Sequence, residues 1–168
     1  MADFSDVAAR RKRRTIRVPV VLDGELAAQV IDLQKRLAVA EKLDEQLNRP
    51  PEAPNVREQI ADLEEQAGDS VQDFVFTELP RRRYRDLLDK HPPTGDDAKT
   101  RRWDEDTFAP ALMAAAAVDP PLTPEQASQI WEEWGTAQCD ALFAGAWAAQ
   151  EGEQRVPFGR AASVTTDV

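Results

Sequence analysis

Apolar and polar residues alternate along two separate stretches of the chain, and this pattern predicts two β-strands. The first stretch is 15–22, which is rich in β-branched side chains. The apolar residues on one side of it are Ile16, Val18, Val20 and Leu22. The second stretch is 71–79, where Phe74 and Phe76 share a face. Pro19 has no N–H to donate to a neighbouring strand, so we expect 15–22 to lie at an edge and to pair with 71–79 as a two-stranded ribbon.

Between the two strands, apolar residues recur at alternating spacings of four and three, the pattern of helices with one packed seam. This predicts a helix over 23–47, with Asp23 as its N-cap, and a second helix over 55–67. The seam residues of the two helices are Leu26, Val30, Leu33, Leu37, Ala40 and Leu47, interrupted by Asp44, and then Val56, Ile60, Leu63 and Ala67. The proline-rich segment 49–54 joins them, so we expect an antiparallel, coiled-coil-like helical hairpin. Its charged outer faces should lie in solvent, although a docking rod or a dimer contact is an alternative.

A further helix is expected to start at Pro80, directly after the second strand. Proline is favoured in the first turn of a helix. The helix should end at His91-Pro-Pro93, because proline restricts the residue before it and has no N–H of its own. Its apolar face consists of Tyr84, Leu87 and Leu88. Residues 94–102 are expected to form an exposed loop.

Three more helices are predicted in the C-terminal half. The first is capped by Asp104 or Asp106 and runs to about Val118. The second begins with Thr123-Pro-Glu-Gln, where threonine takes the N-cap position, and it ends before the third begins at Thr136. The apolar residues of these last two helices are Ala127, Ile130, Trp131, Trp134, Cys139, Leu142, Phe143, Ala146 and Trp147.

Together these elements predict a mainly α protein with a small two-stranded β-ribbon, in which an antiparallel helical hairpin precedes a C-terminal helical bundle. We expect four regions along the chain. Residues 1–13 form a disordered basic arm and 14–79 a strand, hairpin and strand. Residues 80–150 form the C-terminal helical domain and 151–168 a flexible tail.

The charge of the chain narrows its possible partners. The net charge is −10 at pH 7 over 168 residues, and the pI is about 4.6. General binding to nucleic acid needs a basic surface that displaces counterions, so we expect no nucleic-acid partner. No apolar run approaches the roughly 20 residues of a membrane helix, and the N-terminus lacks the apolar core of a signal peptide. We therefore expect no membrane partner and a cytoplasmic location.

One basic cluster interrupts this acidic chain, Arg10-Arg-Lys-Arg-Arg14. One interpretation is an arm that contacts nucleic acid or an acidic partner. The simpler interpretation, which we favour, is a solvated tail that lies against the acidic surface of the protein itself.

Residues suited to catalysis or metal binding are few. His91 is the only histidine and Cys139 the only cysteine, so no multi-histidine site, thiolate cluster or internal disulfide can form. The acidic run Asp104–Asp106 lies at a predicted helix start, where the helix dipole explains it more simply than a cation site does. We expect no enzyme activity, no cofactor and no metal. For His91 we expect a helix-ending role, in which its ring satisfies carbonyls of the last turn.

Aromatic residues of the C-terminal half are the candidates for a partner-binding surface. They are Trp103, Phe108, Trp131, Trp134, Phe143 and Trp147. Some of them must fill the core of so small a domain, and this is the leading interpretation, but exposed indoles are also frequent binding anchors. The alanines at 114–117 add a surface on which another helix can pack closely. We place the candidate site on this block because the charged hairpin is poorly suited to an apolar partner.

Three segments, taken in order, resemble one protein family. An aromatic-x-aromatic strand leads into Pro80-Arg-Arg-Arg-Tyr-Arg-Asp-Leu-Leu88 and a helix-ending His-Pro-Pro. Next comes Trp103-Asp-Glu-Asp-Thr-Phe-Ala-Pro-Ala-Leu112. The third segment is Val118-Asp-Pro-Pro-Leu-Thr-Pro-Glu-Gln-Ala127, which leads to Trp131 and then to Asp140-Ala-Leu-Phe143, so that the resemblance covers roughly 14–150. Together they resemble the tail assembly chaperones of long-tailed (siphovirus-type) phages of actinobacteria, most strongly over 74–147. The matching residues, expected to be structural, are Phe74, Phe76, Tyr84, Leu87, His91, Pro92, Pro93, Pro110, Leu112, Pro120 and Leu122.

The resemblance implies a role that composition does not. Members of this family bind the tape measure protein, shield its long apolar helices and help to recruit tail tube protein. Many are also made in a longer, frameshifted form. The implied partners are therefore the tape measure protein, the tail tube protein, and the longer form or a homo-oligomer. The implied location is the host bacterial cytoplasm, with absence from the mature virion. The alternatives are a structural virion component, such as a head–tail connector subunit, or a nucleic-acid-binding regulator that uses the 10–14 arm.

Overall fold

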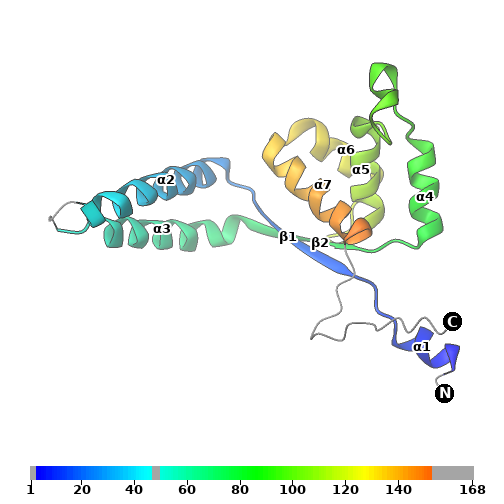
Figure 1. Cartoon of the computed structure of the whole chain (residues 1–168), viewed down its shortest axis with the longest axis horizontal. Helices are drawn as coiled ribbons and strands as arrows, with labels where there is room; N and C mark the ends of the chain where they lie inside the picture. Colours follow the sequence, from blue (N-terminus) through cyan, green and yellow to red (C-terminus); the bar gives the residue numbers. More distant parts are fainter. Residues whose placement is uncertain (1–2, 47–49, 153–168) are drawn as a thin grey trace, which may run out of the picture.

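The computed structural model describes residues 3–46 and 50–152. A helical hairpin, a small sheet and a group of helices follow one another along its longest axis (Figure 1). The helices are α1 (Phe4–Arg10), α2 (Gly24–Gln46), α3 (Ala53–Ala67), α4 (Arg81–Lys90), α5 (Glu105–Ala116), α6 (Pro124–Glu133) and α7 (Thr136–Glu151). The strands are β1 (Thr15–Val21), β2 (Val71–Thr77) and β3 (Ala117–Asp119), and the 3-10 helices are η1 (Gly68–Ser70) and η2 (Gly95–Lys99). The predicted class, mainly α with a small antiparallel β-structure, is confirmed.

Strands β1 and β2 pair as the sequence predicts. They are antiparallel, with Thr15 opposite Thr77 at one end and Val21 opposite Val71 at the other. The side facing the helices is apolar and consists of Ile16, Val18, Val20, Phe74 and Phe76. Both phenylalanines of this side are buried, Phe76 completely. The predicted strand face is therefore confirmed.

The third strand, β3, was not predicted. The sequence pattern predicts helix up to about Val118, but α5 ends at Ala116 and the next residues are extended. Asp119 precedes Pro120, and a residue before proline is disfavoured in the helical conformation. The extended segment then pairs with the free edge of β2 at Val75 and Phe76. The ribbon is thus a three-stranded sheet with β2 at its centre.

The helical domain packs on the apolar side of this sheet through α5 and α7. Its largest fully buried side chains are Phe76, Phe108, Leu112, Met113 and Leu142. Two predicted helix starts are confirmed. The Asp104 carboxylate accepts the backbone N–H of Asp106, and Thr123 forms a capping box with Gln126.

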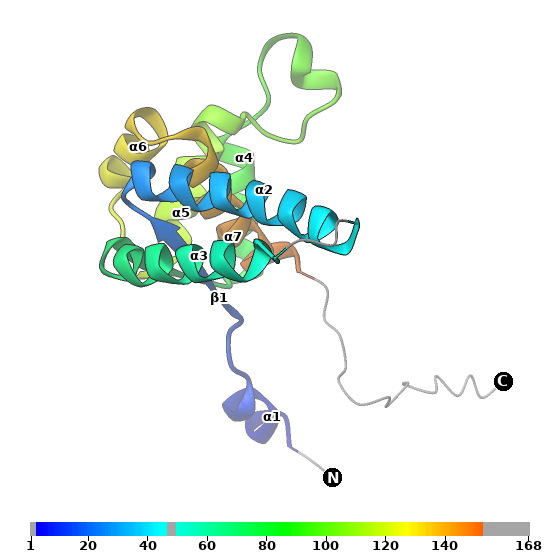
Figure 2. The ribbon, with the colours of Figure 1, turned by 90° about the vertical axis from the view of Figure 1, so that its left-hand side faces the viewer.

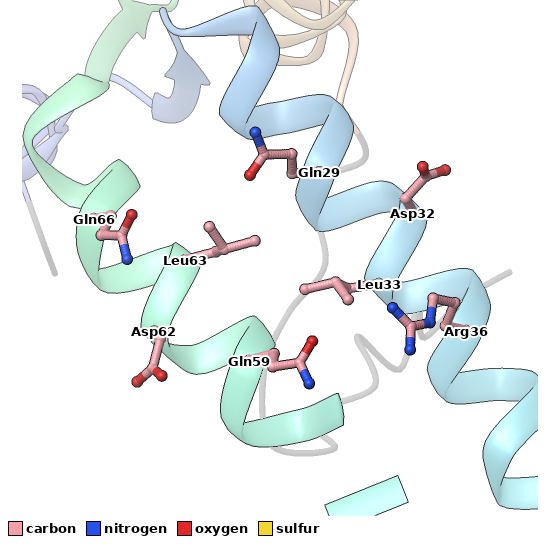
Figure 3. A pocket seen from close by; sticks show the side chains of 8 residues that line it. All are labelled: Gln29, Asp32, Leu33, Arg36, Gln59, Asp62, Leu63 and Gln66. Atoms are coloured by element: carbon pink, nitrogen blue, oxygen red, sulfur yellow. The ribbon is translucent and has the colours of Figure 1, made fainter. Parts of the chain in front are cut away.

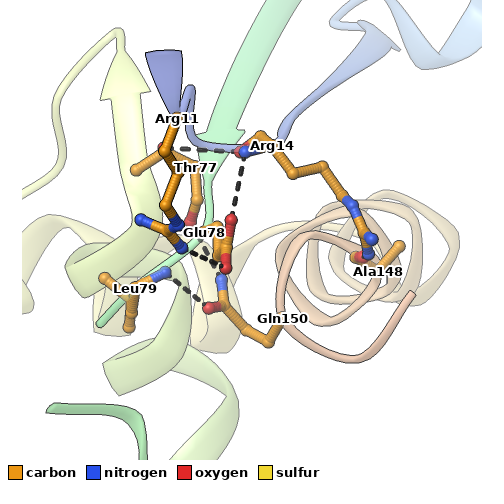
Figure 4. Close-up of polar contacts among 7 residues, drawn as sticks. All are labelled: Arg11, Arg14, Thr77, Glu78, Leu79, Ala148 and Gln150. Carbon is orange, nitrogen blue, oxygen red and sulfur yellow. Dashed lines mark hydrogen bonds and ion pairs between the residues drawn. The ribbon is translucent and has the colours of Figure 1, made fainter. Parts of the chain in front are cut away.

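Two glutamines of α7 fasten the ends of the sheet to this helix. At the start of α7, the Gln138 side chain donates to the carbonyl of Val21 at 2.8 Å. At its end, Gln150 donates to the Thr77 carbonyl at 2.9 Å and accepts from the Leu79 N–H at 2.7 Å (Figure 4). These bonds satisfy backbone groups that the strand ladder leaves without partners.

The helical hairpin projects away from the helical domain and joins it through the ribbon (Figure 1). Its buried residues are Ala40, Ala53, Val56, Ile60 and Ala67, and none of them belongs to the core of the helical domain. The predicted antiparallel hairpin is confirmed, although Leu47 lies outside the described residues. Asp44, which interrupts the predicted seam, has a different role: its carboxylate accepts the backbone N–H groups of Glu52 and Ala53 at the start of α3. The carboxylate caps the partner helix across the loop.

The N-terminal arm differs from the prediction of a disordered segment. Residues Phe4–Arg10 form the helix α1, with Asp6 in its first turn and Arg10 in its last, which suits the helix dipole. The chain after α1 is held by Glu78, which accepts the backbone N–H of Arg14 and pairs with the Arg11 guanidinium at 2.9 Å (Figure 4). The flexible tail predicted for 151–168 lies, from residue 153 onward, outside the described residues.

Candidate functional site

Four of the six predicted binding residues meet on one side of the helical domain. These are Trp103, Trp131, Phe143 and Trp147, which we call the aromatic surface, and each is half-buried. The ring centroids of Trp103 and Trp147 are 4.7 Å apart. The ring centroid of Phe143 lies 6.2 Å from that of Trp131 and 6.2 Å from that of Trp147. Rings in such tilted and edge-to-face contacts hold one another in place. The exposed part of each ring is therefore presented on a fixed support.

The local sequence explains how this surface is assembled. Phe143 and Trp147 are four residues apart on α7 and so lie on one face of the helix. Trp131 comes from α6, and Trp103 directly precedes the capping residue of α5. Three different segments thus converge, and the helix caps fix where two of them begin.

Phe108 lies beneath the aromatic surface and is not part of it. Its side chain is completely buried, with ring contacts to Trp103 at 5.2 Å and to Phe143 at 6.4 Å. Tyr84 also touches it, at 6.4 Å. Phe108 therefore supports the neighbouring rings, and a bound partner cannot reach it directly.

Trp134 is separated from the other indoles. Its ring packs edge-on against Phe74 at 6.2 Å, between α6 and the sheet. A depression of about 420 Å³ lies beside Trp134 and is lined mainly by prolines, glutamines and Leu122. The sequence named these six aromatic residues as candidates and favoured a core role for some of them, without saying which. The structure divides them into four surface residues, one core residue and one residue at a different place.

A pocket of about 370 Å³ adjoins the aromatic surface between Trp103 and Phe143. Its rim is polar: Arg101 pairs with Glu105 at 3.2 Å, and the Arg102 guanidinium lies 5.9 Å from the Trp103 ring centroid. An apolar floor with a charged rim is the usual composition of a protein-binding site.

Tyr84 connects α4 to the end of α7 beside this surface. Its hydroxyl donates to the Glu151 carboxylate at 2.9 Å, and Arg102 lies 3.8 Å from the same carboxylate. Burial of the phenol and, next, its hydrogen bond to Glu151 raise the pKa of Tyr84 above its ordinary value. Tyr84 therefore remains a neutral donor at physiological pH and serves to hold two helices together.

Most of the residues that carry the family resemblance are buried or half-buried, which fits a structural role. Phe74, Phe76, Pro110 and Leu112 are buried, and Tyr84, Leu87, His91, Pro93, Pro120 and Leu122 are half-buried, whereas Pro92 is exposed. The prediction for the ring of His91 is wrong. Among the described residues it makes no hydrogen bond to a carbonyl, and it packs edge-on against Phe108 at 6.2 Å.

Two surface features were missed by the sequence analysis. The first is a groove of about 480 Å³ between α2 and α3, which we call the hairpin groove (Figure 3). Leu33 and Leu63 point into it, while glutamines and the carboxylates Asp32 and Asp62 form its edges. The spacing of its residues, seven positions from Gln29 to Arg36 on α2 and from Gln59 to Gln66 on α3, was available in the sequence.

The second missed feature is a group of arginines at the start of α4. Arg81, Arg82, Arg83 and Arg85 are exposed, and none of them forms an ion pair with another described residue. The first turn of α4 contains no acidic residue. Cations at this end of a helix oppose its dipole, so the arrangement lowers the stability of α4.

Cys139 and the acidic residues offer no chemistry of their own in the described part of the chain. Cys139 is buried, its thiol lies 3.3 Å from the Ile130 carbonyl, and burial raises its pKa, so little reactive thiolate forms. Within residues 3–46 and 50–152, no group of His, Cys, Asp or Glu side chains is placed to hold a metal ion. Over the same residues, no helix combines the length and apolar character needed to cross a bilayer.

Searches of known protein families, of curated proteins and of solved structures found no match to this chain.

Proposed function

We propose that this protein is a tail assembly chaperone of a long-tailed phage, which binds the tape measure protein and helps to recruit tail tube protein. The observation that carries the proposal is the aromatic surface on a helical domain whose segments resemble that family. Trp103, Trp131 and Trp147 keep part of each indole exposed although they pack against the core. Half-exposed, rigidly supported indoles are typical anchors of protein-binding sites.

The chemistry of the client fits such a surface. A long apolar helix needs a partner that covers it with apolar side chains and small residues. Aromatic rings offer large contact areas at little cost in side-chain entropy. The arginine and glutamate rim beside Trp103 leaves charged groups at the border of the contact, where they remain hydrated. The hairpin offers mostly charged faces, which lose hydration on contact with an apolar helix.

The net charge of −10 also suits a chaperone. A strongly charged protein keeps its complex with an apolar client apart from other copies and so limits aggregation. This role belongs to assembly in the host cytoplasm, and the protein should then be missing from finished virions. Mass spectrometry of purified particles tests this part, because a connector subunit is present in stoichiometric amounts.

Co-expression with fragments of the tape measure protein tests the binding role. The variants Trp103→Ala, Trp131→Ala and Trp147→Ala should lose most of the co-purified fragment. Trp134→Ala is the matched control, since its indole lies outside the aromatic surface, and it should retain the fragment. Circular dichroism must first show that all four variants are folded. Retention of the client by all three surface variants, with loss in hairpin charge reversals, contradicts the proposed site.

A further inference from the structure

The helix α1 carries an apolar face that no other described residue of the chain covers. Phe4 is 82% exposed and Val7 is 49% exposed, and both belong to the most exposed large apolar residues of the described chain. Ala8 follows them at helical spacing, so the three side chains lie on one face of two helical turns. An apolar face on so short a helix is expected to find a partner.

The hairpin groove offers a complementary site of matching size, with two leucines on its floor between polar and charged edges. Leu33 and Leu63 line its floor. A separate depression of about 280 Å³, which shares Arg36 with it, lies nearer the loop end of the hairpin and includes the 58% exposed Val39. The lining of the hairpin groove on α2 runs over eight residues, from Gln29 to Arg36, which is about 12 Å at 1.5 Å per residue. α1 is seven residues long, one residue shorter than this lining, so the groove can hold the whole helix.

The charges of the two elements are complementary. Five consecutive basic residues, 10–14, end α1 or follow it. Arg11 and Arg14 contact Glu78 of their own chain, and Arg10, Lys12 and Arg13 are exposed. Helix α3 contains four carboxylates and one arginine. The groove is lined by Asp62 of α3 and Asp32 of α2, and the cation that also lines it, Arg36, pairs with Glu52 at 3.7 Å. Basic residues beside an acidic rim raise the rate of association and set the orientation of a contact.

Geometry prevents the arm from occupying the groove of its own chain. The contacts of Arg11 and Arg14 with Glu78 fasten the chain after α1 to the far end of the ribbon. The hairpin leaves from the opposite end, so α1 and the groove lie at opposite ends of the molecule (Figures 1 and 2). The α1 helix of a second copy of this chain matches the groove in apolar contact, in length and in charge, and it can reach the groove.

We propose that α1 of one copy docks in the hairpin groove of another copy, with Phe4 and Val7 against Leu33 and Leu63. Each copy has one arm and one groove, so the contact either closes a pair by mutual exchange or continues from copy to copy. The contact area of one short helix is well below that of a standard interface, so we expect weak association, with Kd of about 10–100 µM. This inference does not depend on the proposed function, because it needs no client.

Analytical ultracentrifugation of the full chain over a range of concentrations gives the first test. The sedimentation coefficient should rise with concentration and fall when salt is added. The double variant Phe4→Ser/Val7→Ser should remain monomeric. Val118→Ser, a similarly exposed valine on β3, is the control and should associate like the natural chain. A natural chain that stays monomeric, or a double variant that associates normally, overturns the proposal.

The groove side is tested by a matched pair of charge reversals on α3. Asp62 lies on the groove rim and Glu64 is exposed and does not line it. Asp62→Arg should weaken association at least tenfold, whereas Glu64→Arg, the same change in charge, should weaken it much less. Equal effects of the two variants indicate general electrostatic attraction without docking and overturn the proposed site.

Disulfide trapping locates the contact directly. Val7→Cys chains mixed with Gln59→Cys chains under oxidising conditions should form a crosslinked mixed dimer, since a disulfide requires Cα atoms roughly 4.4–6.8 Å apart. Val7→Cys mixed with Glu64→Cys should form much less, and the buried Cys139 is common to all chains. Mixed dimers at equal yield with both partners contradict docking in the groove.

Discussion

Gly145 on α7 and Val18 on β1 approach so closely that no side chain fits between them. A Cβ atom on residue 145 would lie 2.1 Å from Cγ2 of Val18 and 3.4 Å from the ring of Phe76. The missing side chain is what allows the long C-terminal helix to lie directly on the edge strand. Contact of α7 with the sheet, and hence the position of the aromatic surface, depends on this glycine.

Gly145→Ala should therefore destabilise the protein, by about 1–3 kcal/mol, even though alanine favours helix more than glycine does. Urea unfolding followed by circular dichroism measures the change. Gly68→Ala is the control, because a Cβ there meets nothing within 4 Å, and its effect should be small. An unchanged unfolding midpoint for Gly145→Ala contradicts the close packing of α7 on β1.

Replacement of Gln150 by leucine should loosen the end of the sheet. The change leaves the Leu79 N–H and the Thr77 carbonyl without their partner, and an unsatisfied partly buried group costs about 1–3 kcal/mol. Gln129→Leu on α6 is the control, since its side chain bonds only the exposed Glu133. Amide exchange at Leu79 should accelerate in the first variant alone.

The hairpin should be removable without unfolding the rest. Its two helices pack against each other, and none of its buried residues belongs to the core of the helical domain. A short Gly/Ser turn in place of 25–66 should therefore leave a folded sheet and helical domain with cooperative thermal unfolding. Complete loss of structure after this replacement assigns the hairpin to the core.

Single residues show how far the sequence determines this fold. Apolar residues recur every two positions in the strands and roughly every three and a half positions in the hairpin helices. These spacings located the elements, because burial of one side of a strand or helix requires them. In the sequence, Asp44 only interrupts the apolar seam of the hairpin. Its capping of α3 depends on the geometry of the loop, which the spacing of residues does not indicate. β3 was hidden for a similar reason. Its pairing with β2 is a tertiary contact, and the alanine run before it favours helix.

The candidate site was predictable only in part. Spacing on α7 placed Phe143 and Trp147 together, but it did not indicate that Trp134 turns toward Phe74 and away from them. The burial of Phe108 depends on α4 and α7, which are distant from it in the sequence. The hairpin groove was overlooked because glutamine and aspartate around one leucine pair look like an ordinary solvated surface.

The only tyrosine gives a test by pH. In the folded protein, burial and the Glu151 carboxylate raise the pKa of Tyr84, whereas in the unfolded chain it should ionise near its ordinary value of 10.0. Between these two pKa values the unfolded state loses the proton that the folded state keeps, so stability falls as the pH rises above about 10. Spectrophotometric titration should show a raised midpoint that returns to normal in urea. Tyr84→Phe should flatten the alkaline loss of stability.

Hydrogen exchange with and without a helical fragment of the tape measure protein tests the proposed function most directly. Binding at the aromatic surface should slow amide exchange in α6, in α7 and around Trp103, which are the segments that support the four rings. Exchange in α2 and α3 should remain unchanged in samples dilute enough to keep the chain monomeric. Slower exchange confined to the hairpin, or no change anywhere at saturating fragment, contradicts the proposal.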